Sequence, residues 1–254
     1  MKGRFDARIR RAEQLAQSHA PARELLDFYR ELAGFQARIF DLVQSDCETD
    51  VRALAKHFPG LIDVATRSGP AGLAQRGRER IADRVAGEGL LQAAWDAAGA
   101  HALAADPIGR FFTRVLLQPF AEYLASRGDV RANPESRTCP FCSSWPVAGV
   151  LRGEGDGGKR WLLCATCSTE WPFRRVLCWN CGEENKDHLP VYSATEFPAV
   201  RVDACDTCHV YFKSVDLTKD GHAVPMVDEI ASVALDIWAE EHGYQKLQQN
   251  LLGT

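Results

Sequence analysis

Hydrophobic residues in the first half of the chain recur at the spacing of an α-helix. Between positions 25 and 42, apolar side chains return at steps of three and four residues, which places them on one helix face. These residues are Leu25, Phe28, Leu32, Phe35, Ile39 and Leu42. Pro21 is compatible with the first turn, where an amide has no partner within the helix. The pattern therefore predicts a long amphipathic helix from about Pro21 onward.

A second helix is predicted to begin after position 49 or 50 and to end at Pro59-Gly60, a pair that commonly terminates helices. Its inward-facing residues are expected to be Val51, Leu54 and Phe58. Residues 68–89 carry several glycines and arginines and predict a helix with loose ends. The helical period returns over residues 90–103 and 108–124, where Pro119 is expected to kink or begin a helix. Residues 1–127 are therefore interpreted as a helical domain.

The composition changes after this region and changes again near the end of the chain. Residues 128–138 are polar and contain Gly, Asn and Pro, which is typical of a linker. Residues 223–254 restore a helical period and predict a C-terminal helix. Its apolar stripe is expected to contain Val227, Ile230, Ala234, Ile237 and Trp238.

The overall composition is that of an ordinary globular protein. The 254 residues are 46% hydrophobic and 25% charged, and they suffice for two domains. No apolar run approaches the roughly 20 residues of a membrane helix, and charged MKGRFDARIR is followed by no hydrophobic stretch. We therefore expect a soluble, cytoplasmic protein without signal peptide or membrane insertion.

Eight of the nine cysteines form four closely spaced pairs in the second half of the chain. The pairs are Cys139-x2-Cys142, Cys164-x2-Cys167, Cys178-x2-Cys181 and Cys205-x2-Cys208. Two thiolates three positions apart can bind one metal from a tight turn, and two such turns supply a tetrahedral set. All eight residues are therefore predicted metal ligands. The ninth, Cys47, is interpreted as a small buried hydrophobic residue.

An internal repeat favours consecutive grouping of these pairs over a cross-braced one. The gaps within the two halves are 21 and 23 residues, and the segments that lead into Cys164 and Cys205 resemble each other. Repeated units usually close their own cores. We therefore expect one four-cysteine ribbon over 139–172 and another over 173–222, each with short antiparallel strands. Reduced thiols in the cytosol argue against disulfides, and no pair opens a long helix as in thioredoxin-like proteins.

Aromatic side chains and histidines surround the cysteine pairs. Trp145, Trp171, Trp179, Tyr211 and Phe212 are expected to shield the metals and fill the contact between ribbons, with any exposed member available for docking. His188 and His209 are not needed as ligands, because eight cysteines complete two sites. Spacing alone leaves zinc and iron open, since both suit tetrahedral thiolates.

The charge distribution gives no support for a nucleic-acid partner. The formal net charge is -4, and residues 139–208 contain seven Lys or Arg against nine Asp or Glu. Eight thiolates on two divalent ions add further negative charge. Without a basic surface, counterion release cannot drive binding to nucleic acid.

The order of these features resembles the FdhE-type formate dehydrogenase accessory proteins. The segments that carry the resemblance are Cys139-Pro140-Phe141-Cys142, Leu163-Cys164-Ala165-Thr166-Cys167 with Trp171, Cys178-Trp179-Asn180-Cys181-Gly182, Cys205-Asp206-Thr207-Cys208 with Tyr211-Phe212-Lys213, and Leu235-Asp236-Ile237-Trp238-Ala239-Glu240 with Gly243-Tyr244. The architecture matches over the whole chain, but the specific motifs lie only within 139–252. The resemblance implies an α+β protein with a helical N-terminal domain, two tandem rubredoxin- or zinc-ribbon-like modules and a C-terminal helix.

The resemblance also implies a function. It implies a cytoplasmic protein that binds iron at two rubredoxin-like sites, with zinc as the alternative occupant. Such a protein contacts the catalytic subunit of formate dehydrogenase and supports assembly of that enzyme. One feature departs from the family pattern: a glycine follows the second cysteine of a pair only at Gly182, whereas Ser143, Ser168 and His209 occupy the other positions. Such positions favour positive φ, so these three turns are expected to be strained or differently shaped.

Two other functional classes remain as alternatives. One is an enzyme that uses a metal site directly, but the sequence contains no nucleotide-binding glycine loop, HExxH or GxSxG motif. Four cysteines per site also leave no open coordination position, so we predict no catalytic residue and no organic cofactor site. The other is a structural zinc-ribbon adaptor for another protein assembly or for nucleic acid. The sequence does not define an oligomeric state.

Overall fold

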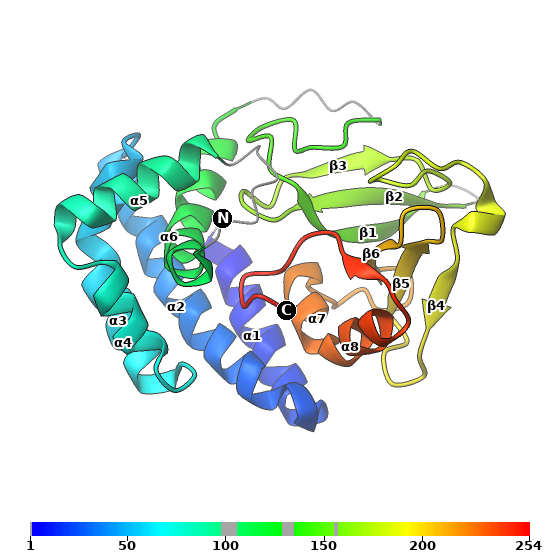
Figure 1. Cartoon of the computed structure of the whole chain (residues 1–254), viewed down its shortest axis with the longest axis horizontal. Coiled ribbons are helices and arrows are strands. Elements are labelled where there is room, and N and C mark those ends of the chain that lie inside the picture. Colours follow the sequence, from blue (N-terminus) through cyan, green and yellow to red (C-terminus); the bar gives the residue numbers. More distant parts are fainter. Residues whose placement is uncertain (1, 98–105, 129–134, 155–156) are drawn as a thin grey trace.

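The computed structural model has a helical N-terminal half and a sheet in the second half, which confirms the predicted α+β class (Figure 1). It describes residues 2–97, 106–128, 135–154 and 157–254. The helices are α1 (Lys2–Ser18), α2 (Arg23–Asp46), α3 (Phe58–Ser68), α4 (Leu73–Arg80), α5 (Arg84–Asp96), α6 (Pro107–Ala125), α7 (Pro225–Ala231) and α8 (Val233–Glu241), with short 3-10 turns at Ala20–Ala22, Val51–His57 and Lys186–His188. The strands are β1 (Pro146–Glu154), β2 (Gly157–Cys164), β3 (Glu170–Phe173), β4 (Val191–Ser193), β5 (Val200–Cys205), β6 (Val210–Asp216) and β7 (Gln245–Lys246).

The helix predicted after Pro21 is α2, which lies between α1 and α6 and is buried on more than one face. Phe28, Leu32, Phe35 and Ile39 are buried as expected. A second row, which the one-face interpretation did not include, is also buried and consists of Leu26, Tyr29, Ala33, Gln36, Phe40 and Val43. The prediction for Leu42 was wrong, because its side chain is 46% exposed. A helix packed on two sides needs apolar residues over a wider arc than a surface helix.

One boundary in the helical half differs from expectation. Pro59-Gly60 does not close a helix: residues Val51–His57 form a 3-10 turn, and α3 begins at Phe58 with Pro59 in its first turn. Proline suits that position because its missing amide hydrogen is not needed there. Pro119 lies inside α6. The expected linker over 128–138 and the end of the helix expected over 90–103 fall partly outside the described residues.

The two predicted ribbons are present, but they join into one sheet with the order β3-β2-β1-β6-β5-β4. Within each ribbon the strands are antiparallel, and β1 pairs with β6 in parallel from Ala148↔Lys213 to Leu151↔Asp216. Gly149 permits this close approach, because a Cβ there would collide with the side chains of Ser214 and Phe212. The sequence did not predict the pairing of β1 with β6, which joins the two ribbons into one hydrogen-bonded sheet.

The expected C-terminal helix is broken at Ser232 into α7 and α8 and ends at Glu241. The buried ammonium group of Lys213 on β6 donates hydrogen bonds to the carbonyl oxygens of Glu229 and Ser232. In an uninterrupted helix these carbonyl oxygens would instead accept hydrogen bonds from backbone amides four residues later. Past the break the stripe is displaced: Ala234 and Ile237 are exposed, contrary to prediction, and Leu235 is buried.

A shared hydrophobic core connects the helical half to the sheet. Val147 and Val150 of β1 and Leu163 of β2 belong to the same cluster as Phe40 of α2 and Val115 of α6. The first ribbon is therefore packed directly on the helices. None of the described helices is both long enough and apolar enough to cross a membrane.

Candidate metal centres

The structure gathers the eight paired cysteines into two separate clusters in the consecutive grouping. The first contains Cys139, Cys142, Cys164 and Cys167, and the second contains Cys178, Cys181, Cys205 and Cys208, with all sulfur atoms of a cluster within 4.8 Å of one another. The cross-braced alternative is thus excluded. The repeat in the sequence predicted this grouping.

The sulfur separations suit a tetrahedral metal site and not disulfides. In the first cluster the Sγ atoms of Cys139 and Cys167 are 3.4 Å apart, as are those of Cys142 and Cys164. In the second cluster the Cys178–Cys208 and Cys181–Cys205 pairs are each 3.7 Å apart. A disulfide requires about 2.05 Å, and all of these cysteines are free. Four sulfurs at about 2.3 Å from a central ion are about 3.8 Å apart, so the clusters fit zinc or iron with little adjustment.

The turns that present the sulfurs share one backbone conformation. The residue after the second cysteine has positive φ in all four: 60° at Ser143, 54° at Ser168, 86° at Gly182 and 56° at His209. In three of the turns this residue donates its amide hydrogen to the carbonyl of the first cysteine, at Cys139, Cys178 and Cys205. The expectation of positive φ at these positions is confirmed. The turns with Ser and His have the same shape as the turn with Gly, at a conformational cost.

This cost makes a reciprocal pair of substitutions informative. Ser143→Gly is expected to raise the free energy of unfolding by about 0.5–1 kcal/mol, because glycine adopts positive φ without strain. Gly182→Ala is expected to lower it by about 1–2 kcal/mol, because a Cβ there would lie 2.7 Å from Arg137 Nη2 in a backbone with φ of 86°. Urea denaturation of the metal-loaded proteins measures both changes. Equal effects of the two substitutions would contradict this account of the turns.

Burial and crowding of the thiols make each cluster suited to hold a cation. Burial raises the pKa of the Cys164 thiol and of the Cys178 thiol, whereas hydrogen bonding from Cys139 lowers the pKa of Cys142. Four thiolates at these distances repel one another strongly in a medium of low dielectric constant. A bound divalent or trivalent ion removes that repulsion, which is why thiolate ligands lose their protons when metal binds.

The first cluster is anchored to the helices by buried polar residues that sequence reasoning missed. Arg8 of α1 donates to Glu122 of α6 at 2.7 Å and to the hydroxyl of Ser168 at 2.9 Å, and that hydroxyl donates to Glu122 at 2.7 Å. Gln118 of α6 donates to the carbonyl of Ala165 at 2.8 Å. The available signal was a charged residue inside the apolar run Phe120-Ala121-Glu122-Tyr123. The partner residues are too distant in sequence to be inferred from it.

The second cluster lies nearer the surface. Cys181 is exposed and Cys208 is half-buried, whereas Cys178 and Cys205 are buried. The Thr207 hydroxyl donates to the Glu183 carboxylate at 2.6 Å, which joins the two turns of this cluster. Cys47 is also exposed, at the end of α2 with φ of 50°, so its interpretation as a buried residue was wrong. A small apolar residue is often buried, but this one occupies a left-handed position that terminates a helix.

The aromatic residues near the cysteines mostly fill the interior. Trp171, Trp179, Tyr211 and Phe212 are buried, and the rings of Trp145 and Trp179 meet edge to face with centroids 4.4 Å apart. This contact connects the two ribbons near both clusters. Trp171, Trp179 and Phe212 pack in one cluster with Cys139, Cys164 and Cys167, whereas Tyr211 packs against α8. Trp145 alone of the five is half-buried, and the shielding of a metal stays a prediction.

Comparisons with known proteins point to one family. Residues 138–175 match the family model described as "FdhE, central domain", and residues 176–252 match "FdhE, C-terminal domain". The chain is 38% identical over 152 residues to "Protein FdhE homolog" of Aquifex aeolicus, covering 58% of this chain and 53% of that protein. It is 40% identical over 126 residues to the homolog of the same name from Pseudomonas aeruginosa, covering 46% and 40%.

A solved structure extends the likeness to the helical half. The crystal structure of the FdhE protein from Pseudomonas aeruginosa superposes with a TM-score of 0.69 at 25% sequence identity, covering 100% of this chain and 97% of that one. In sequence, the matched region spans about half or less of the length of the curated relatives. The family models thus match the half that carries the two cysteine clusters, and the helical half is similar in fold to the solved structure.

Proposed function

Because this chain is an FdhE-type protein, we propose that it is an accessory protein that supports assembly of active formate dehydrogenase by contacting the catalytic subunit of that enzyme. We further propose that each four-cysteine cluster binds one iron ion in the cytoplasm. The proposed ligands are Cys139, Cys142, Cys164 and Cys167 at one site and Cys178, Cys181, Cys205 and Cys208 at the other. The observation that carries this proposal is the pair of tetrahedral thiolate clusters in a chain of this family.

The closed shape of both clusters supports a role other than catalysis. Each cluster supplies four sulfur atoms within 4.8 Å of one another, so a bound ion keeps no free position for a substrate. Iron held by four thiolates would supply a one-electron redox centre, whereas zinc would supply folding energy alone. The amides of Thr166 and Cys167 donate to Cys164 Sγ at 3.3 and 3.4 Å. Such hydrogen bonds stabilise negative charge on sulfur and adjust a reduction potential.

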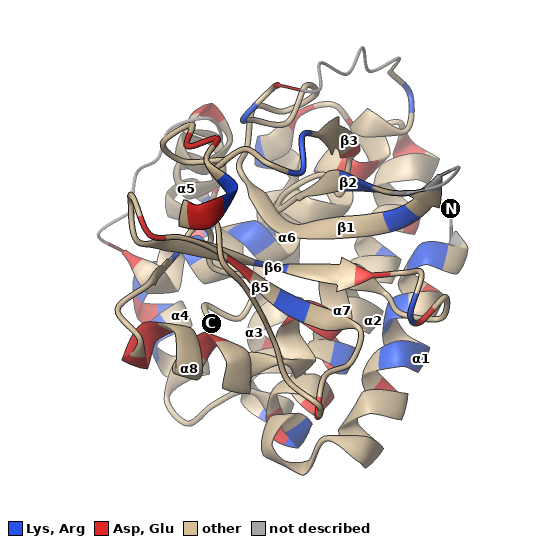
Figure 2. Cartoon of the chain, turned by 90° about the vertical axis from the view of Figure 1, so that its right-hand side faces the viewer, with Lys and Arg blue, Asp and Glu red and all other residues tan. Residues whose placement is uncertain are grey.

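The surface charge favours a protein partner over nucleic acid. Figure 2 shows Lys and Arg interspersed with Asp and Glu on the side formed by the sheet. Several of the cations are compensated by neighbours, such as Arg152 by Glu170 at 2.9 Å and Arg201 by Asp203 at 2.9 Å. A phosphate backbone would need an uncompensated basic stripe.

Two measurements test the proposal. Deletion of the gene is expected to lower formate dehydrogenase activity without lowering the transcript, and the wild-type chain, but not a Cys164→Ser variant, is expected to restore it. Anaerobic purification followed by metal analysis and visible spectroscopy is expected to give two irons per chain with a rubredoxin-like absorption. Unchanged enzyme activity after deletion contradicts the accessory role. A colourless zinc protein that still restores activity contradicts the iron assignment and leaves the structural zinc-ribbon adaptor as the better description.

A further inference from the structure

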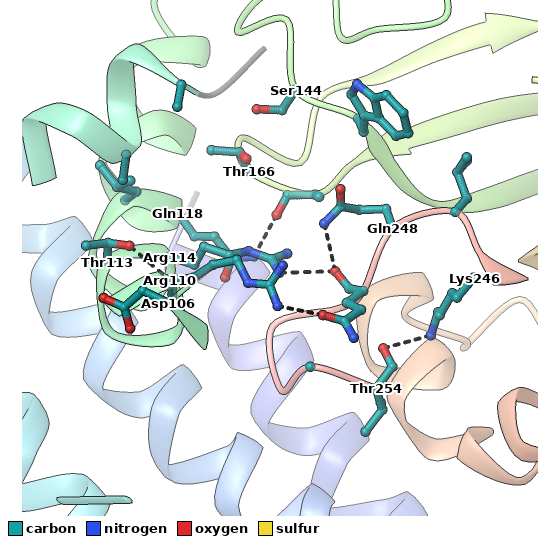
Figure 3. A pocket seen from close by; sticks show the side chains of 18 of the residues that line it. Asp106, Arg110, Thr113, Arg114, Gln118, Ser144, Thr166, Lys246, Gln248 and Thr254 are labelled. Atoms are coloured by element: carbon teal, nitrogen blue, oxygen red, sulfur yellow. Dashed lines mark hydrogen bonds between the residues drawn. The ribbon is translucent and has the colours of Figure 1, made fainter. Parts of the chain in front are cut away.

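A large cavity lies where α6, the two cysteine clusters and the C-terminal segment after β7 meet (Figure 3). Its volume is about 880 Å³, which is within the range of about 300–1,000 Å³ of sites for small organic ligands. Apolar side chains form part of its wall, among them Trp95, Leu117 and Leu247. Polar side chains that face it include Gln118 and Thr166. The cavity is thus lined by both apolar and polar side chains.

Two arginines of α6 bring positive charge into this cavity. Figure 3 shows the guanidinium groups of Arg110 and Arg114 side by side, pointing toward the segment after β7. Arg110 donates to the side-chain oxygen of Gln249 at 2.8 Å. Arg114 donates through Nη1 to the carbonyl oxygens of Gln249 and Asn250, at 3.1 and 2.8 Å. All of these acceptors are neutral.

Glu229 and Cys164 attract Arg114, but in the part of the chain that the structure describes no direct ion pair holds either arginine. Arg114 Nη2 is buried and has no hydrogen-bond partner, and among the described residues no carboxylate pairs with either guanidinium. Of the other charged groups that line the cavity, Asp106 pairs with Arg80 and Lys246 pairs with Glu229, while the Glu240 side chain is exposed. Burial, followed by repulsion from Arg110, lowers the pKa of Arg114 to about 10.

Two buried cations elsewhere in the same fold each have the direct carboxylate partner that Arg110 and Arg114 lack among the described residues. Arg8 contacts Glu122 at 2.7 Å, and Lys213 contacts Asp236 at 2.6 Å. Buried charges are normally paired because an isolated one is costly in a low-dielectric interior. A cavity that holds two adjacent guanidinium groups without an anion is therefore suited to receive one.

We propose that this cavity binds a small organic anion, with its phosphate or carboxylate group on Arg110 and Arg114 and its apolar part against Trp95 and Leu117. An inorganic ion would leave most of the cavity unused, whereas an organic body gains from burial against the apolar wall. The cavity also reaches Cys208 of the second cluster, so a ligand held there lies next to a proposed metal centre. The site does not depend on the accessory role.

Isothermal titration calorimetry of the metal-loaded full chain tests the site with probes that share one ring. Phenyl phosphate and benzoate carry the two candidate anionic groups, phenol lacks the charge, and inorganic phosphate lacks the ring. At least one of the two ring anions is expected to bind at one site per chain, at least about ten-fold more tightly than phenol and inorganic phosphate. The better of the two identifies the anionic group.

Substitutions locate the binding. Arg110→Gln and Arg114→Gln are each expected to weaken binding of the preferred probe by about ten-fold or more, whereas Arg52→Gln on the exposed surface leaves it unchanged. Among the described residues, the one hydrogen bond that Arg110→Gln removes is that to the side chain of Gln249, so this variant serves if Arg114→Gln does not fold. Absence of saturable binding by both ring anions overturns the proposal. So does binding that survives both α6 substitutions or weakens equally in Arg52→Gln.

Discussion

Replacement of Cys164 by serine is expected to remove one of two metal ions per chain and to unfold more than the ribbon that contains this residue. A structural site with four thiolates contributes on the order of 10 kcal/mol, while a whole domain is stable by only about 5–15 kcal/mol. Cys164 is fully buried, and its neighbours Leu163 and Ala165 belong to the core shared with the helices. Because β1 pairs with β6, unfolding of the first ribbon is also expected to destabilise the second ribbon.

The second cluster gives a graded comparison. Cys181→Ser should also remove one metal ion, but its effect on the helical half should be smaller, because Cys181 is exposed at a cluster nearer the surface. Cys47→Ser is the matched control, since that thiol is exposed and outside both clusters. Metal analysis and chemical denaturation followed by circular dichroism measure these changes. Two metal ions retained in Cys164→Ser, or equal destabilisation by Cys47→Ser, would refute the assignment of ligands.

Replacement of Lys213 by methionine is expected to lower the free energy of unfolding by about 3–5 kcal/mol, which is typical of removing one member of a buried ion pair. The Lys213 side chain is fully buried and lies 2.6 Å from Asp236 and 3.2 Å from Glu229. Lys246 contacts the same two carboxylates, with 3.0 Å to Asp236. Without Lys213, two buried carboxylates share one ammonium group. The network joins β6, β7, α7 and α8, so its loss should loosen the C-terminal segment.

Two controls isolate the effect of burial and charge. Arg84→Met removes the ion pair between Arg84 and Glu88, in which the Arg84 side chain is 72% exposed. This substitution should change the free energy of unfolding by less than about 0.5 kcal/mol. The second control is the dependence of stability on acid pH, through the carboxylate of Glu229. Burial alone would raise the pKa of Glu229, but Lys213 and Lys246 outweigh it and lower that pKa to about 2.

The sign of the acid effect follows from that lowered pKa. The stabilisation from ionised Glu229 is complete above its ordinary pKa of about 4.5 and is lost as the pH falls toward 2. The stability difference between wild type and Glu229→Gln should therefore shrink between pH 5 and about pH 2. A difference that stays constant over this range would show that the charge of Glu229 is not what stabilises the fold.

The sequence contained the local information about the two cysteine clusters. Paired cysteines within tight turns have a fixed geometry, so the spacing and the repeat sufficed to predict which four sulfurs meet. The positions after each second cysteine were predicted to have positive φ, and Ser143, Ser168 and His209 do. These properties depend on a few consecutive residues and one short-range pairing.

The sequence alone determined the α+β class, the helical first half and the grouping of the eight cysteines, because periodicity and spacing act through neighbouring residues. The tertiary structure decided what depends on contacts between distant residues: the pairing of β1 with β6, the helix break that Lys213 imposes at Ser232, and the exposure of Leu42, Ile237 and Cys47. The bridge from Arg8 through Glu122 to Ser168 and the placement of Arg110 beside Arg114 without a direct carboxylate partner in the described part of the chain also depend on such contacts. The spacing of apolar residues indicates which face of a helix or strand prefers burial, but only the packed chain determines what lies against that face.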